Sequence, residues 1–258
     1  MVAVLNVNSV DSSKLRETLL AGGDLPGAEK RQLQAIETLL GLGESSPGEE
    51  LGEDLENDRW EILQAYLLSF KTQPVNWLGG KVYRSLWQQG TPGVQQFLEE
   101  NFPQGFVPLI SEAGVDYSPI EAALLDEAYE VADRLTLQKM CELAGPGAVQ
   151  RKWIYFSEVH QFPIPDLQTL DQLWVVYSEG KFGFSVQRDL WLGVGQVWEK
   201  LWPKMGWKAD NIWTRYPGGF TWDLSAPRGH LPLTNQLRGV RVMDALLSHP
   251  AFGGKPTP

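Results

Sequence analysis

Apolar residues recur at helical spacing along most of this chain, and short turns rich in Gly and Pro separate one run from the next. A spacing of about three to four residues places the apolar side chains on one face of a helix, and short connections favour antiparallel neighbours. Runs of this kind predict helices at 11–22, 27–42, 60–70, 77–89 and 92–101. We therefore expect an N-terminal antiparallel helical bundle.

The helical spacing stops between Phe102 and Gly114, where two prolines and two glycines interrupt it. We place the domain boundary there, with the bundle and a linker at 1–110 and a second all-helical domain with long loops at 111–258. Ser118 and Glu121 have the spacing of a capping box that opens this domain. Asp166 or Thr169 is expected to cap a later helix. The predicted fold class is all-α.

Composition limits the partners and the compartment. A formal net charge of -10 argues against nucleic acid as a partner, because binding to phosphates requires a basic surface. The single cysteine, Cys141, leaves no intramolecular disulfide and no cysteine-type metal cage. No secretion signal and no apolar run of the ~20 residues that span a membrane is visible. We expect a cytoplasmic monomer with at most peripheral membrane association.

No motif predicts catalysis or a bound metal. Asp223 with His230, or Glu158 with His160, has the residue types of an acid–base pair. Neither pair is accompanied by a nucleophile elbow or a cluster of metal ligands. We therefore expect no catalytic residues, and we expect these histidines and His249 to serve in turns or hydrogen bonds.

The segment from Trp213 to Asp244 differs from the rest of the chain. It holds four Arg and two Asp, a local charge of +2 (4 − 2) in an acidic protein. Its first part is an aromatic loop broken by Pro and Gly, and its last part predicts a helix from Thr234. On that helix three polar residues share one face, opposite an apolar face. The polar residues are Asn235, Arg238 and Arg241, and the apolar residues are Leu237, Val240, Met243 and Leu247. A basic, aromatic segment suits a flat anionic partner.

Several blocks of the second domain follow a recognisable pattern. They are Asp116-Tyr117, Ala132-Asp133, DLQTLDQLW at 166–174, Tyr177-Ser178 and GKFGFSVQ at 180–187. Together they resemble the Genomes Uncoupled tetrapyrrole-binding family, that of the fourth genomes-uncoupled protein, found in cyanobacteria and chloroplasts. The resemblance covers roughly 116–252, and the N-terminal half is similar to the variable bundle of cyanobacterial members.

This resemblance implies an all-helical core, likened to a cupped hand, that binds protoporphyrin IX and magnesium protoporphyrin IX without a permanently bound cofactor. It implies a non-catalytic protein that stimulates magnesium chelatase in chlorophyll synthesis, mainly through the large porphyrin-binding chelatase subunit. Any membrane association would be peripheral, at the thylakoid. In this chain the resemblance assigns porphyrin binding to Asn235, Arg238 and Arg241.

A protoporphyrin is a flat apolar disc with two propionates on one edge, so its site needs apolar walls and a cationic edge. Exposed carboxylate–arginine pairs contribute only about 0 to 1 kcal/mol each, and apolar contact must therefore supply most of the affinity. The wall candidates come from two loops. They are Phe162, Ile164, Leu167, Trp213, Tyr216, Phe220 and Trp222. Trp174 and Trp198 are expected in the core.

The alternative function is a helical protein–protein adaptor that binds no pigment.

Overall fold

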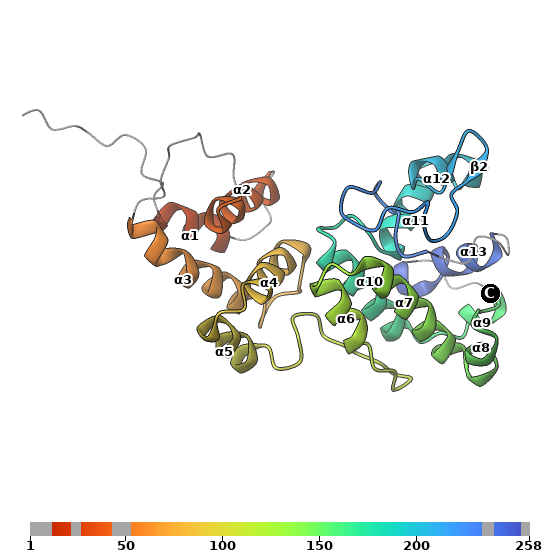
Figure 1. Cartoon of the computed structure of the whole chain (residues 1–258), viewed down its shortest axis with the longest axis horizontal. Helices are drawn as coiled ribbons and strands as arrows, with labels where there is room; N and C mark the ends of the chain where they lie inside the picture. Colours follow the sequence, from red (N-terminus) through yellow and green to blue (C-terminus); the bar gives the residue numbers. More distant parts are fainter. Residues whose placement is uncertain (1–11, 22–26, 43–52, 234–239, 254–258) are drawn as a thin grey trace, which may run out of the picture. The chain divides into compact units, whose positions relative to one another are not determined.

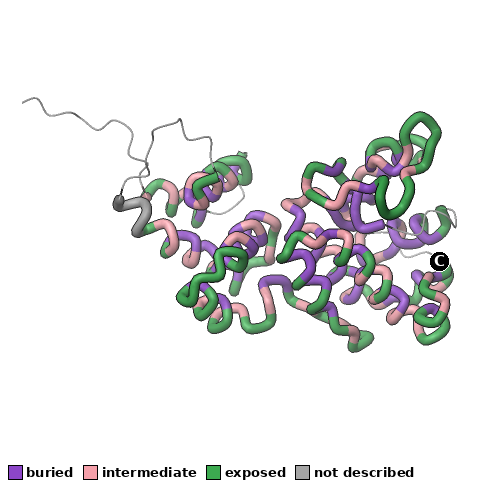
Figure 2. The backbone as a smooth tube through the Cα atoms, in the orientation of Figure 1, coloured by how far each residue is buried: buried purple, intermediate pink, exposed green. Residues whose placement is uncertain are grey.

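The structure, a computed structural model, describes residues 12–21, 27–42, 53–233 and 240–253. The chain divides into two compact units, Met1–Asn101 and Phe102–Pro258. Each unit has its own buried core, and exposed residues lie mainly on turns and on outer helix faces (Figure 2). The segment that we predicted as the boundary opens the second unit.

The first unit is built from helices that pack mainly on their neighbours in the chain (Figure 1). They are α1 Ser12–Leu20, α2 Ala28–Leu40, α3 Glu53–Ser69, α4 Trp77–Gln89 and α5 Pro92–Asn101. Helix α4 begins where the Asn76 side chain accepts a hydrogen bond from the Gly79 N–H at 3.0 Å, a local signal that fixes its first turn. The predicted helical bundle is confirmed.

The second unit is also mainly helical. Its helices are α6 Ser118–Leu125, α7 Tyr129–Ala144, α8 Pro146–Arg151, α9 Phe156–Val159, α10 Ile164–Tyr177, α11 Phe184–Gly193, α12 Trp198–Lys204, α13 Arg241–Leu247 and a 3-10 turn at Pro250–Phe252. A hairpin of two short antiparallel strands, β1 Lys208–Ala209 and β2 Ile212–Trp213, was not predicted. The all-α prediction is otherwise confirmed.

The capping box predicted at Ser118 is wrong. The N–H and the hydroxyl of Ser118 both donate to the Asp116 carboxylate, at 2.9 and 2.7 Å. Glu121 is buried and accepts a hydrogen bond from the Tyr177 hydroxyl at 2.5 Å. A long-range partner on α10 therefore holds the glutamate that would have closed the capping box.

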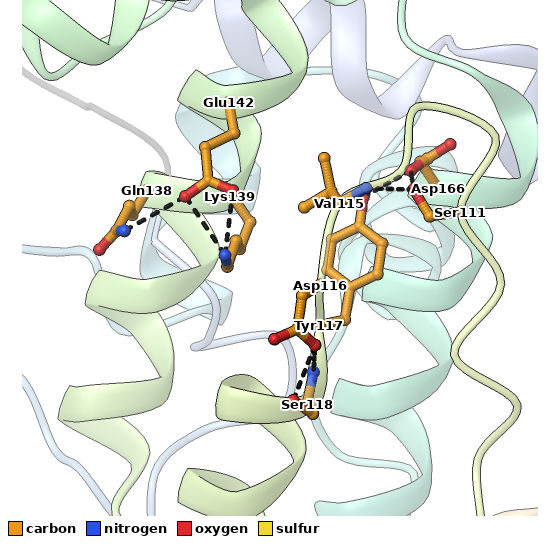
Figure 3. A network of polar contacts seen from close by, with 9 residues as sticks. All are labelled: Ser111, Val115, Asp116, Tyr117, Ser118, Gln138, Lys139, Glu142 and Asp166. Carbon is orange, nitrogen blue, oxygen red and sulfur yellow. Dashed lines mark hydrogen bonds and ion pairs between the residues drawn. The ribbon is translucent and has the colours of Figure 1, made fainter. Parts of the chain in front are cut away.

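Asp166 is not a cap either. It lies in the first turn of α10, is fully buried, and holds the 111–117 segment (Figure 3). Its carboxylate accepts hydrogen bonds from the Ser111 and Tyr117 hydroxyls, the latter at 2.8 Å. Two backbone N–H groups also donate to it, from Glu112 at 2.9 Å and Ala113 at 3.3 Å. These bonds anchor the start of the second unit to α10.

The residues that the structure describes show neither a membrane-spanning helix nor a metal centre. Among these residues no helix is both long and apolar enough to span a membrane. Nor do three or more His, Cys, Asp or Glu side chains gather there in a way that could hold a metal ion.

Gly183 occupies a position that no other residue suits. Its φ is +127°, and a Cβ atom there would lie 2.8 Å from both Asp171 Oδ1 and Val175 Cγ2. Its N–H donates to the Leu231 carbonyl at 3.0 Å, so the backbone cannot shift freely. We expect Gly183→Ala to lower the free energy of unfolding by about 3 kcal/mol, because strain and overpacking add.

Urea unfolding followed by circular dichroism measures this effect. Gly193→Ala is the matched control, since a methyl group on the Gly193 Cα would have nothing within 4 Å and its φ is not in the left-handed region. The control should unfold at the wild-type urea concentration or slightly above it. Equal midpoints for Gly183→Ala and the wild type would contradict the strain argument.

Candidate functional site

The candidate cationic edge lies at the start of α13. Asn235 and Arg238 fall outside the described residues, and α13 begins at Arg241. The Arg241 side chain is exposed as predicted, and its guanidinium carbon lies 5.4 Å from the centre of the Phe156 ring. Val240, predicted on the buried face, is 39% exposed because it precedes the first helical residue.

The contact between Arg241 and Phe156 joins α13 to α9, two helices that pack together. On this side Phe156 is 39% exposed and Tyr155 is 48% exposed. Arg151 lies over the Tyr155 ring, 4.5 Å from its centre, and pairs with Glu158. The structure thus places two exposed aromatic rings beside two arginines.

Sequence reasoning did not select Tyr155 or Phe156 as site residues. A signal was available, because Trp153, Tyr155 and Phe156 occur within four positions of one another, between the run Gly145-Pro146-Gly147 and Pro163. Aromatic residues that crowd a short connection between helices cannot all enter the core.

Four wall candidates come from this region. Trp213 lies in strand β2 of the hairpin, and Tyr216, Phe220 and Trp222 lie in the loop that follows it. Trp213 and Tyr216 are exposed, Trp222 is partly buried, and Phe220 is buried. The Trp222 ring lies 6.0 Å from that of Tyr216 and 6.1 Å from that of Phe220. The structure therefore brings Tyr216, Phe220 and Trp222 into one aromatic group, while the Trp213 ring lies 5.5 Å from that of Trp202.

The other wall candidates lie around the start of α10. Ile164 is 43% exposed and can meet a ligand, whereas Phe162 and Leu167 are buried against the protein. Trp174 is fully buried and donates to the Thr136 hydroxyl at 2.9 Å, which confirms its predicted place in the core.

Trp198 is only partly buried, contrary to the prediction, although its ring stacks between those of two buried tryptophans, Trp191 and Trp202. We call Trp191, Trp198, Trp202 and Trp207 the tryptophan stack. Successive ring centres lie 5.0, 5.2 and 5.6 Å apart, with interplanar angles of 26°, 18° and 7°. The stack joins α11, α12 and the start of the hairpin, and Trp213 contacts it through Trp202.

The histidines serve in hydrogen bonds where they are buried. His230 Nδ1 lies 2.6 Å from the Met205 carbonyl, and its Nε2 accepts from the Thr221 N–H at 3.2 Å. Burial lowers the pKa of His230, which favours the neutral ring. His249 is buried and accepts from the Ala251 N–H at 3.2 Å.

The two acid–base pairs considered from the sequence are engaged elsewhere. Asp223 accepts from the Ser225 N–H at 2.7 Å, and His230 is held by backbone groups. Glu158 pairs with Arg151 and accepts from the Tyr155 N–H at 2.7 Å. These contacts fix the local geometry of the residues that they join.

Comparison with known proteins adds an independent observation. Residues 110–250 match the family described as GUN4-like, and residues 3–103 match an ARM-like repeat domain described as GUN4-N terminal. A Ycf53-like protein of Synechocystis sp. is 49% identical over 228 residues, which cover 87% of this chain and 91% of that protein.

Two further relatives are informative. An Arabidopsis thaliana protein named "Tetrapyrrole-binding protein, chloroplastic" is 36% identical over 150 residues, 55% of this chain and 57% of that protein. The solved structure of GUN4 from Chlamydomonas reinhardtii superposes with a TM-score of 0.54 at 41% identity, covering 57% of this chain and 95% of that one. The GUN4-like match at residues 110–250 includes the candidate site.

Proposed function

The chain belongs to the GUN4-like family, and from that premise we propose that it is a non-catalytic porphyrin-binding regulator. Its proposed ligands are protoporphyrin IX and magnesium protoporphyrin IX, and its proposed effect is to stimulate magnesium chelatase in chlorophyll synthesis. The observation that carries the proposal is the exposed Arg241–Phe156 pair, which sets a cation beside an exposed aromatic ring. The name of the Arabidopsis relative supports the ligand class.

The described residues offer both parts of a porphyrin site. Arg241 supplies a cation for a propionate, and the apolar contact comes from Tyr155, Phe156 and Ile164, all exposed. Micromolar affinity corresponds to about 8 kcal/mol, of which one exposed ion pair gives about 1 kcal/mol at most. Covering roughly 300 Å² of apolar ring gives ~7 kcal/mol before association costs. The aromatic residues should therefore supply the affinity and the arginine the orientation.

The proposed protein partner is the large porphyrin-binding subunit of magnesium chelatase. The first unit is a candidate for contact with such a partner, because residues 3–103 match an ARM-like repeat domain. Repeats of paired helices form extended surfaces suited to protein binding. The same observation favours the second candidate function, a helical adaptor that binds protein and no pigment.

A titration with a water-soluble dicarboxylate porphyrin, followed by tryptophan fluorescence, tests the proposed function. We expect saturable quenching in the micromolar range for the wild type. Arg241→Ala should weaken binding about fivefold, the value of one exposed ion pair, and Phe156→Ala about tenfold or more through lost apolar contact. With an uncharged porphyrin analogue, the Arg241→Ala effect should disappear while the Phe156→Ala effect remains.

Arg16→Ala is the control, because Arg16 is an exposed arginine of α1 in the other unit. Its affinity should equal that of the wild type. If the wild type shows no quenching beyond absorption by the porphyrin itself, the adaptor is the better description. Equal binding by the wild type and Arg241→Ala would remove Arg241 from the site.

A further inference from the structure

His160 differs from the other two histidines of the chain because its imidazole ring is open to solvent. It follows α9 directly, and its side chain is exposed. Among the residues that the structure describes, neither ring nitrogen of His160 has a hydrogen-bond partner. His230 and His249, in contrast, are buried and bonded to backbone groups. His160 therefore keeps a nitrogen lone pair free for an external partner.

The His160 ring lies on the exposed surface that carries the proposed porphyrin contacts. Its centre is 6.4 Å from the centre of the Phe156 ring, and the two ring planes meet at 89°. Phe156 contacts Arg241, and the exposed Ile164 follows four residues after His160 at the start of α10. An imidazole thus accompanies the aromatic and cationic contacts already assigned to this surface.

The right angle between the two rings suits a porphyrin that carries a metal. An aromatic side chain that stacks on a flat ring lies parallel to it. An imidazole that binds the central metal points one nitrogen at it, so the imidazole plane is perpendicular to the macrocycle. Two side chains that act in these ways on one face of a porphyrin are perpendicular to each other. Phe156 and His160 have this relation before any ligand binds.

The chemistry of the ligand fits an imidazole as well. Magnesium or zinc in a porphyrin is held by four nitrogens in one plane, which leaves an axial position for a further ligand. A neutral imidazole is the commonest metal ligand among side chains. Phe156, Ile164 and Arg241 offer no lone pair, so His160 is the nitrogen ligand among these contacts. A metal-free porphyrin has no axial position and gains nothing from the imidazole.

We propose that His160 is the axial ligand to the metal of a bound metalloporphyrin, and that it makes the site prefer a porphyrin with a metal over the metal-free one. The inference rests on the proposed function and deepens it, because it ranks the two proposed ligands. Magnesium protoporphyrin IX is favoured over protoporphyrin IX. A protein with this preference holds the product of metal insertion more tightly than its substrate.

Titration of the full chain with the zinc form and the metal-free form of one water-soluble dicarboxylate porphyrin tests the proposal. Zinc in a porphyrin takes one axial ligand, and nitrogen ligation moves the main absorption band to longer wavelength. We expect the wild type to bind the zinc form about tenfold more tightly, the low end of what groups around a metal contribute. His160→Ala should lose this preference and the band shift, and it should bind the metal-free form as the wild type does.

Free imidazole separates metal ligation from mere proximity of the side chain. Added to the zinc-porphyrin complex of His160→Ala, it should move the absorption band to the wild-type position, because it supplies the missing ligand. Added to the wild-type complex, it should change nothing, because the axial position is already filled. An equal response of the two complexes to imidazole would overturn the proposal.

Gln161→Ala is the matched control. Gln161 is the exposed residue next to His160, and its backbone N–H, which donates to the Glu158 carbonyl, is unaffected by the substitution. This variant should match the wild type with both porphyrins. A wild type that binds the two forms equally well would defeat the assignment of His160 and leave the proposed function standing. A wild type that binds neither form would defeat both.

Discussion

Asp166→Ala is expected to lower the free energy of unfolding by about 3–5 kcal/mol, a large share of the 5–15 kcal/mol typical of a globular domain. The wild-type carboxylate is fully buried and accepts from the hydroxyls of Ser111 and Tyr117 and from the N–H groups of Glu112 and Ala113. Alanine leaves the buried Tyr117 hydroxyl and three partly buried donors without their acceptor. Loss of an acceptor that serves several donors costs more than loss of any single bond.

Thermal and urea unfolding of the full chain measure this effect. Asp116→Ala is the control, because Asp116 is exposed and, among the described residues, its carboxylate accepts local bonds from the N–H and hydroxyl of Ser118. The Asp116→Ala substitution should lower the free energy of unfolding by about 1 kcal/mol, the usual contribution of a local side-chain cap. If both variants unfold alike, the 111–117 segment does not depend on Asp166.

Asp133→Asn is expected to stabilise the chain at about pH 8 by on the order of 2–4 kcal/mol, and to leave it unchanged near pH 4. An unfolded aspartate has a pKa of about 3.9, whereas burial raises the pKa of folded Asp133 to about 7. Between these values the folded chain keeps the proton and the unfolded chain has lost it. Stability therefore falls as pH rises from about 4 to about 7, and the loss is complete above that range.

Urea unfolding of the wild type and of Asp133→Asn at several pH values checks this prediction. Asparagine carries no proton in this range, so the difference between the two proteins should grow from about zero near pH 4 and level off above about pH 7. A smaller decline should remain in the variant, because Asp171 titrates in the same direction with a pKa of about 6. A pH-independent difference between the two proteins would mean that Asp133 does not carry the raised pKa.

Local sequence signals predicted the helices well. The bounds of α4 and α5 agree with the prediction because Asn76 before α4 and Pro92 at the start of α5 are signals within the helix or next to it. Val175 and Val176 are β-branched residues, which favour strands, yet both lie in α10. Periodicity and caps are properties of neighbouring residues, so a single sequence can reveal them.

Side chains held by distant partners could not be predicted in this way. Glu121 and Asp166 were each given a capping role, yet Tyr177 and the 111–117 segment hold them across the fold. The turn at Asp210-Asn211, with φ of 48° and 62°, closes the β1–β2 hairpin. Two adjacent residues that tolerate positive φ are a hairpin signal, but strands of two residues are too short to show an alternating pattern.

The candidate site could likewise be predicted where it depends on local signals and could not be predicted where it depends on long-range packing. The sequence predicted the exposure of Arg241, because an arginine on the polar face of an amphipathic helix lies in solvent. It could not predict that Phe156 lies under that arginine, since the contact depends on how α9 packs against α13.

The tryptophan stack has a consequence for optical measurements on this protein. Its indole rings are nearly parallel and about 5–6 Å apart, so excitation absorbed by one ring passes to the next before it is emitted. Trp213 touches this array through Trp202 at 5.5 Å. A quencher beside Trp213 would therefore lower the emission of several indoles at once. The extent of fluorescence loss would report this shared excitation, and only the concentration dependence would report the affinity.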